Sequence, residues 1–184
     1  MKFTFIPLVL LTGMLLAGCS THPTANGLML DAVGPDLSPM QSTCATGTNG
    51  LLVVYSAYRR NADFNARDPY RPEYSDYEIF SSAGVFQQRV HNNSGTILQE
   101  VMPVSLPAGQ FKVKARANGY GFVIVPVVIT PGQTTTLHLE GGGNWPNPSI
   151  FNQTNAVRLP DGIIVGWKAD LTTLPSPTIE PVTK

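Results

Sequence analysis

The sequence predicts an all-β protein, built as a single antiparallel β-sandwich of about seven strands. Three observations favour this fold. Glycine (17) and proline (16) are frequent among the 184 residues and separate short apolar runs. Several of these runs alternate apolar and polar residues with the period of two that a strand requires. No long amphipathic helix is visible in the chain.

The chain begins with a segment typical of an export signal. Lys2 supplies a positive charge, and residues 3–17 are almost wholly apolar, a run too short to span a bilayer comfortably. The run ends in the letters LAGC at positions 16–19, which resemble the bacterial lipobox. The resemblance implies cleavage between Gly18 and Cys19, a lipid on the Cys19 thiol and acylation of the new amino terminus. Several acyl chains together hold a protein firmly, because each buried methylene contributes about 0.8 kcal/mol.

The residue after the cysteine bears on the destination. By analogy with the sorting rule of Gram-negative lipoproteins, an aspartate there favours retention in the inner membrane, whereas Ser20 favours the outer one. We therefore expect a lipid-anchored protein of the bacterial cell envelope, at the outer membrane and facing the periplasm or the exterior. Its acyl chains make the membrane its first predicted partner. The 12 basic and 12 acidic residues balance, which disfavours a nucleic-acid partner.

Residues 1–18 are thus expected to be a removed signal peptide, and residues 19–49 a lipidated cysteine with a tether. As a flexible coil of about 30 residues, the tether would reach roughly 30 Å. Its apolar patch, residues 28–33, is expected to dock on the domain as an extra edge strand. Cys44 has no partner in the chain if Cys19 is lipidated, and it lies among small residues, so we predict a passive thiol.

The predicted β-sandwich occupies residues 50–140. Residues 51–58 are β-branched, aromatic and apolar on both faces, which favours a central strand. Residues 59–76 are predicted to form a long polar connection, which is either functional or a packed Ω-loop. Residues 77–90 are predicted to form a hairpin, in which Gly84 can supply the positive φ of the turn.

Two strands follow, and the second has the clearest pattern. Residues 96–106 are predicted to form one strand, in which Pro103 marks an edge or a bulge. Residues 110–117 alternate strictly, which predicts a strand packed on one face only. The inward side chains are Phe111, Val113 and Ala115, and the outward ones are Lys112, Lys114 and Arg116.

The last two strands of the domain lie on either side of a Pro-Gly turn. Residues 122–129 are a continuous apolar run, and Pro126 within it predicts an edge or a bulge. In the closing strand, Leu137 and Leu139 are expected to face the core and His138 to face outward.

Residues 104–139 carry a recognisable pattern of strand, turn and core positions. The positions that match are Leu106, Pro107, Gly109, Phe111, Val113, Gly119, Tyr120, Val127, Ile129, Gly132, Leu137 and Leu139. The pattern resembles the PEGA and carboxypeptidase-regulatory-like modules, over about a fifth of the chain. The resemblance implies a prealbumin-like or immunoglobulin-like sandwich. Such modules mostly serve as accessory, spacer or binding domains, and they have no catalytic residues to carry over.

The composition changes after residue 140. Residues 141–155 are rich in glycine, asparagine and proline, and two apolar runs follow around a Pro-Asp-Gly turn, a hairpin signal. We therefore assign residues 141–170 to an aromatic loop and a C-terminal hairpin. Residues 171–184 contain three prolines and no periodicity, so a disordered tail is predicted.

Aromatic residues in the loops are the candidate binding residues. Tyr70, Tyr74, Trp145 and Phe151 could form a platform for a sugar or a peptide. The favoured explanation is that these rings cover the open end of the core, since β-sandwich cores need such plugs. Binding of carbohydrate or peptidoglycan is therefore the alternative function.

The polar connection also offers a weak candidate metal site. Asp63, Asn65 and Asp68 supply oxygen ligands at close spacing, as calcium requires. The glycine and the terminal glutamate of an EF-hand loop are missing, which favours a solvated loop held by arginine–carboxylate pairs.

Catalytic motifs are absent from the sequence. It contains no G-x-S-x-G elbow, P-loop, H-E-x-x-H or C-x-x-C, and its three histidines lack the spacing of a metal site. The sequence predicts no cofactor and no catalytic residue. We expect a non-enzymatic structural or interaction module with an envelope protein or glycan as partner, and a hydrolase is the third possibility.

Overall fold

The computed structural model describes residues 27–36, 48–60, 72–92, 100–141, 145 and 147–170. Strands dominate these ranges, which confirms the predicted all-β class. The described part of the chain contains no helix with the length and apolar character needed to cross a membrane. The predicted signal peptide, its cleavage site at Gly18, the lipidation site Cys19, Cys44 and the tail 171–184 lie outside the described residues.

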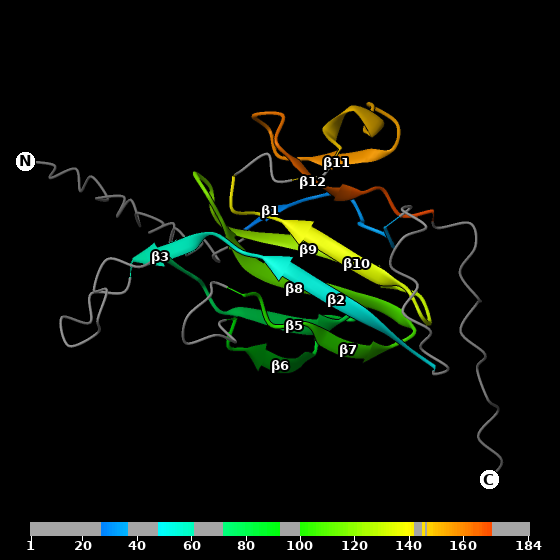
Figure 1. The fold of residues 1–184 in the computed structure, drawn as a ribbon. Coiled ribbons are helices and arrows are strands. Elements are labelled where there is room, and N and C mark those ends of the chain that lie inside the picture. The colour runs from blue at the N-terminus through cyan, green and yellow to red at the C-terminus, as the bar shows by residue number, and fades with distance from the viewer. Residues whose placement is uncertain are drawn as a thin grey trace, which may run out of the picture.

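Two larger sheets form the body (Figure 1). The five-stranded sheet has the order β1-β9-β8-β5-β6. Its strands are β1 (Leu28–Met29), β9 (Gly121–Ile129), β8 (Gly109–Ala117), β5 (Tyr77–Ser81) and β6 (Phe86–Val90). The three-stranded sheet has the order β10-β2-β7. Its strands are β10 (Thr134–His138), β2 (Asn49–Tyr55) and β7 (Val104–Pro107).

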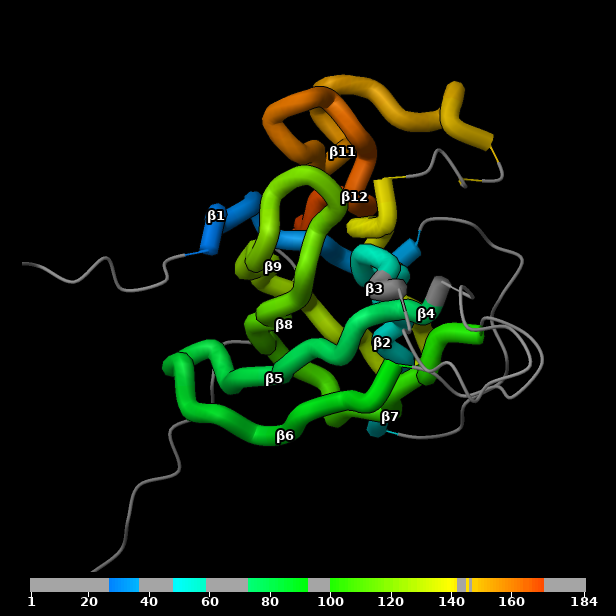
Figure 2. The backbone as a smooth tube through the Cα atoms, turned by 90° about the vertical axis from the view of Figure 1, so that its left-hand side faces the viewer, coloured from blue at the N-terminus to red at the C-terminus, as the bar shows by residue number. Residues whose placement is uncertain are grey.

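Two small ribbons complete the described structure. One pairs β3 (Tyr58–Arg60) with β4 (Pro72–Tyr74). The other pairs β11 (Ala156–Arg158) with β12 (Ile164–Trp167), as the Pro-Asp-Gly turn predicts, and follows a 3-10 turn at Pro148–Ile150. The second ribbon lies over the edge of the body beside β10 (Figures 1 and 2).

The sheets are mixed, which corrects the prediction of a purely antiparallel sandwich. β1 runs parallel to β9, and β10 runs parallel to β2. Nine strands rather than about seven are described between residues 49 and 138. The physical reason for the error is that apolar alternation fixes the face of each side chain, whereas strand direction depends on pairing between distant segments. β2 is the central strand of its sheet, as predicted.

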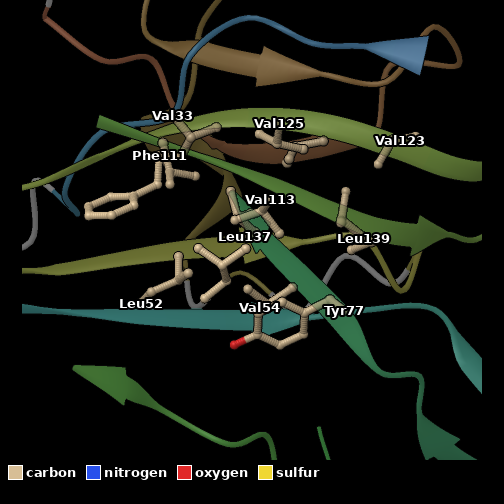
Figure 3. Close-up of a cluster of buried hydrophobic side chains, with 14 of the residues drawn as sticks. Val33, Leu52, Val54, Tyr77, Phe111, Val113, Val123, Val125, Leu137 and Leu139 are labelled. Atoms are coloured by element: carbon tan, nitrogen blue, oxygen red, sulfur yellow. The ribbon is translucent and has the colours of Figure 1, made fainter. Parts of the chain in front are cut away.

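The inner faces of both sheets contribute to one apolar core (Figure 3). Val113 of β8 and Val125 of β9 face Leu52 of β2 and Leu137 of β10, and all four are fully buried. Burial of one such side chain stabilises the fold by about 1.5–3 kcal/mol. The inward set predicted for residues 110–117 is confirmed, since Phe111, Val113 and Ala115 are all buried.

The turns of the two predicted hairpins depend on glycine. Gly84, between β5 and β6, has φ 86°, and Gly162, between β11 and β12, has φ 91°. Side chains with a Cβ rarely adopt such values, so glycine permits these tight reversals. The hairpin predicted over residues 77–90 is confirmed. Of the strand predicted over residues 96–106, residues 96–99 lie outside the described residues, and the described part forms a strand from Val104, after Pro103.

Residues 27–36, within the range assigned to a tether, form part of the body. β1 pairs with β9 at the edge of the five-stranded sheet, which confirms the predicted docking of residues 28–33. Farther along, the amide of Val33 donates to Pro126 O at 2.9 Å, and Val128 N donates to Val33 O at 2.9 Å. On its other side Val33 pairs with Lys168. This segment therefore joins β9 to the C-terminal ribbon.

Pro126 explains why the pairing of residues 27–36 with β9 is irregular. Leu28 lies opposite Val123, but Val33 lies opposite Val127, so five steps on one strand match four on the other. Proline has no N–H to donate at this point of the ladder. The resulting bulge agrees with the interpretation of Pro126 as a marker of an edge or a bulge.

Candidate functional site

Aromatic rings gather on the outer face of the three-stranded sheet. The strand alternation that buries Leu52, Val54 and Leu137 turns Tyr55 and His138 to the opposite face, where these two residues lie side by side in the parallel register of β2 and β10. Their rings stack with centroids 4.5 Å apart and planes 8° from parallel. This stack is the centre of the candidate site.

A continuous series of ring contacts extends from this stack in both directions. On one side, Tyr74 meets Tyr55 edge-on at 5.8 Å and stacks on Tyr58 at 4.8 Å. On the other side, Trp145 lies 4.2 Å from His138. The series then passes from Trp145 to Phe151 at 4.7 Å and from Phe151 to Trp167 at 4.1 Å. We call these seven residues the aromatic row.

Two of the predicted binding rings in the row are closed to solvent. Tyr74 is 6% exposed and Phe151 is 7% exposed, whereas Trp145 is half-buried and Tyr58 is 43% exposed. The indole N–H of Trp145 donates to Ile164 O at 3.2 Å, which fixes the ring against β12. The row therefore fills the space between the outer face of the three-stranded sheet and the C-terminal ribbon, where Trp145 and Phe151 belong to a small apolar cluster separate from the main core.

A buried polar pair lies beneath these rings. His138 Nδ1 is 2.8 Å from Glu140 Oε1, and both side chains are buried. An ionised carboxylate can only accept, so Nδ1 carries the hydrogen in that state of the pair. The second oxygen, Glu140 Oε2, is buried and has no hydrogen-bond partner within the described ranges.

Asp36 brings a second carboxyl group to the same region. Its Oδ2 accepts a hydrogen bond from Thr136 Oγ1 at 2.6 Å, and its backbone N–H donates to Thr134 O at 2.8 Å. Burial raises the pKa of Asp36 above its ordinary value, against the opposing effects of the Thr136 hydrogen bonds and of the His138 charge. Burial also raises the pKa of Tyr55, and the charges of Glu140 and Asp36 act in the same direction.

His138 corrects one expectation from the sequence. It does face away from the core, as predicted, but it is 5% exposed rather than open to solvent. Alternation fixed the face of the side chain, and the rings of Tyr55 and Trp145 cover that face. The sequence did contain a signal for a polar cluster on this face. Alternate positions of a strand lie on one side, and here they hold Thr136, His138 and Glu140.

The structure brings three of the four predicted binding rings into one row. Tyr74, Trp145 and Phe151 belong to it, and Tyr70 lies outside the described residues. The calcium candidates Asp63, Asn65 and Asp68 also lie outside them. Within the described ranges, no three histidine, cysteine, aspartate or glutamate side chains form a group that could hold a metal ion.

Aromatic rings contact the imidazole of the buried His138–Glu140 pair. An imidazole next to a carboxylate is the arrangement that acid–base chemistry uses, but a reacting group must come within hydrogen-bond reach. Here the rings of Tyr55 and Trp145 lie against the imidazole.

Comparisons of the chain with protein-family models, with curated proteins and with solved structures found no match.

Proposed function

We propose that this chain is a lipid-anchored protein of the bacterial cell envelope, in the outer membrane and facing the periplasm or the exterior. The observation that carries the proposal is the LAGC sequence at positions 16–19, at the end of an apolar run that begins after Lys2. The expected modification is acylation of Cys19 after cleavage at Gly18. The all-β body beyond it supplies a folded module to be held at the membrane.

The body acts in this proposal as a structural or interaction module and not as an enzyme. In support, the His138–Glu140 pair is buried under the aromatic row. We also propose that the two larger sheets make a single sandwich, because their inner faces share one core. The resemblance of residues 104–139 to PEGA-like modules is consistent with an accessory or binding role.

Cysteine substitution tests the anchor. The Cys19→Ala variant is expected to lose labelled palmitate and to leave the membrane fraction, because the acylated thiol is removed. The matched control is Cys44→Ala, which removes the other cysteine of the chain and should keep both properties. Palmitate on the Cys19→Ala protein would contradict the proposal.

Glycan binding is the second candidate, and Trp145 is the ring that bears on it. Trp145 is half-buried, whereas Phe151 and Trp167, the next two members of the row, are buried. A glycan array probed with the protein decides this point. Binding that is lost in Trp145→Ala and kept in Trp167→Phe would favour recognition of a sugar by the row. Absence of binding to peptidoglycan fragments and other glycans would leave the interaction with an envelope protein as the function.

A further inference from the structure

The chain enters the body at residue 27, and the short connection to Cys19 limits the distance between the body and an anchor at that cysteine. Gly27 lies directly against β9, since a Cβ at this position would be 2.6 Å from Phe122 O. Cys19 precedes Gly27 by eight positions. Eight residues span at most about 26–29 Å when fully extended, and a flexible coil of that length has a root-mean-square span of about 14–17 Å. The Phe122 end of the sheet must therefore lie near the anchoring membrane.

Exposed apolar side chains occur at this end of the five-stranded sheet. Met29 is 60% exposed, Phe122 is 49% exposed and Leu28 is 37% exposed. Met29 lies opposite Ile124 in the sheet, and Ile124 lies opposite Lys114. These positions bring β1, β9 and β8 together on the outer face, beside the turn that joins β8 to β9 (Figure 2).

Cations accompany the apolar side chains. Lys114 Nζ lies 5.4 Å and Arg116 Cζ lies 5.8 Å from the centroid of the Phe122 ring. Lys114 also lies 3.7 Å from Glu78 Oε2, while Arg116 is exposed. Aromatic rings settle at the headgroup level of a bilayer, and lysine and arginine are attracted to anionic headgroups. We call Met29, Lys114, Arg116 and Phe122, whose positions share the outer face of the sheet, the basal patch.

We propose that the basal patch rests on the headgroup layer of the phospholipid membrane that holds the acyl chains of Cys19. This inference rests on the proposed function, and it adds an orientation to it. The short connection from residue 19 to residue 27 places the patch at the bilayer, and its mixture of cations and exposed apolar side chains suits that surface. The patch is then a second, weaker membrane contact in addition to the acyl chains. Stable membrane anchoring commonly combines two such signals.

The opposite end of the same sheet provides a matched control. Val85 is 66% exposed and Phe86 is 55% exposed, values close to those of Met29 and Phe122. Ser81, at the end of β5, pairs with Phe111, near the start of β8, whereas Arg116 is near its end. The five positions between Phe111 and Arg116 correspond to about 17 Å along the strand. The control side chains are therefore similar in exposure but farther from the anchor.

The test measures the depth of single sites in a membrane. The full gene with Cys44→Ser is expressed, and the processed protein is purified from membranes and analysed by mass spectrometry for acyl groups on Cys19. Met29→Cys and Val85→Cys in this background each receive an environment-sensitive fluorophore. The labelled proteins are reconstituted into vesicles of phosphatidylethanolamine and phosphatidylglycerol that contain a lipid with a nitroxide in its headgroup.

We expect the nitroxide to quench the fluorophore at residue 29 and to leave the one at residue 85 largely unquenched. Adding Phe122→Ser and Arg116→Gln should reduce quenching at residue 29, and the paired control, Phe86→Ser with Arg89→Gln, should not. If the protein is acylated, equal quenching at both sites, or no quenching at residue 29, would overturn the orientation. A protein without acyl groups would overturn the anchor itself, and mass spectrometry separates that failure from the first.

Discussion

Buried polar atoms differ in how well this fold satisfies them. Asn92 is fully buried, and its side chain donates to Val54 O at 2.7 Å and accepts from Met102 N at 3.0 Å. The hydroxyl of Tyr77 is also buried, but it has no hydrogen-bond partner among the described residues. An unsatisfied buried group costs about 1–3 kcal/mol, whereas a made hydrogen bond contributes about 0.5–1.5 kcal/mol.

Two tyrosines should therefore respond oppositely to loss of the hydroxyl. Tyr77→Phe is expected to raise the free energy of unfolding by about 1 kcal/mol, because it removes an unsatisfied polar atom from the core. Tyr74→Phe should lower it by about 1 kcal/mol, because Tyr74 OH lies 3.2 Å from Tyr58 OH. Urea unfolding of the two variants measures both values, and a destabilised Tyr77→Phe protein would contradict the assignment.

Asp36 should make stability depend on pH. Burial raises its pKa above 3.8, so the folded state holds this proton more tightly than the unfolded state does. The stabilisation is complete below pH 3.8 and is lost as the pH rises through the higher folded-state pKa. Relative to Asp36→Asn, the wild type should therefore lose stability over that window. Urea unfolding from pH 4 to 7 tests this, and a constant difference between the two proteins would refute it.

At the scale of elements, close backbone approach holds the C-terminal ribbon in place. A Cβ on Gly166 of β12 would lie 2.6 Å from Val33 Cγ1 and 2.9 Å from Thr136 O. The ribbon, the segment 27–36 and β10 meet at this glycine. A side chain at residue 166 would force these three elements apart.

Gly166→Ala is accordingly expected to lower the free energy of unfolding by about 1–3 kcal/mol, the usual range for overpacking. Hydrogen exchange should accelerate in β11 and β12. The double variant with Val33→Ala is the control, since shortening Val33 relieves one of the two clashes. Strict additivity of the two single effects would argue against contact between these residues.

Sequence patterns predicted some elements well because the deciding contacts are local. In β8, each side chain faces the core or the solvent according to neighbours two positions away, and Phe111, Val113 and Ala115 follow this rule. The parallel pairing of β2 with β10 could not be predicted, because it joins residues about 80 positions apart. The burial of His138 escaped prediction for the same reason, since its cover comes from Trp145 and not from β10.

The candidate site was predictable in its rings but not in its centre. Tyr74, Trp145 and Phe151 were recognisable as loop aromatics, and the structure places them in one row. Tyr55 looked like an ordinary strand residue, and only the register of β2 and β10 brings it onto His138. Contacts that depend on such long-range pairing leave no signal in a local pattern.

At the scale of the whole molecule, residues 27–36 connect parts of the body that are distant in the sequence. Val33 is fully buried and pairs with β9 on one side and with Lys168 on the other. Asp36 N then donates to Thr134 O of the three-stranded sheet. The segment thus contacts both larger sheets and the C-terminal ribbon.

Shortened proteins test this role. A chain that begins at residue 27 should unfold at nearly the same temperature as one that begins at residue 20, because it keeps every described contact of the segment. A chain that begins at residue 37 should be markedly less stable, since it loses Val33 from the core. Thermal unfolding followed by circular dichroism measures all three proteins. Equal midpoints would show that the segment is dispensable.

The parallel alignment of β1 with β9 also has a mechanical consequence for a protein held at its amino terminus. A pull on residue 27 along the strand loads the bonds Leu30 N to Ile124 O and Val33 N to Pro126 O together, in shear. A hairpin pulled apart at its open end would break its bonds one at a time. The direction of β1 therefore favours resistance of the body to a pull from the proposed anchor at Cys19.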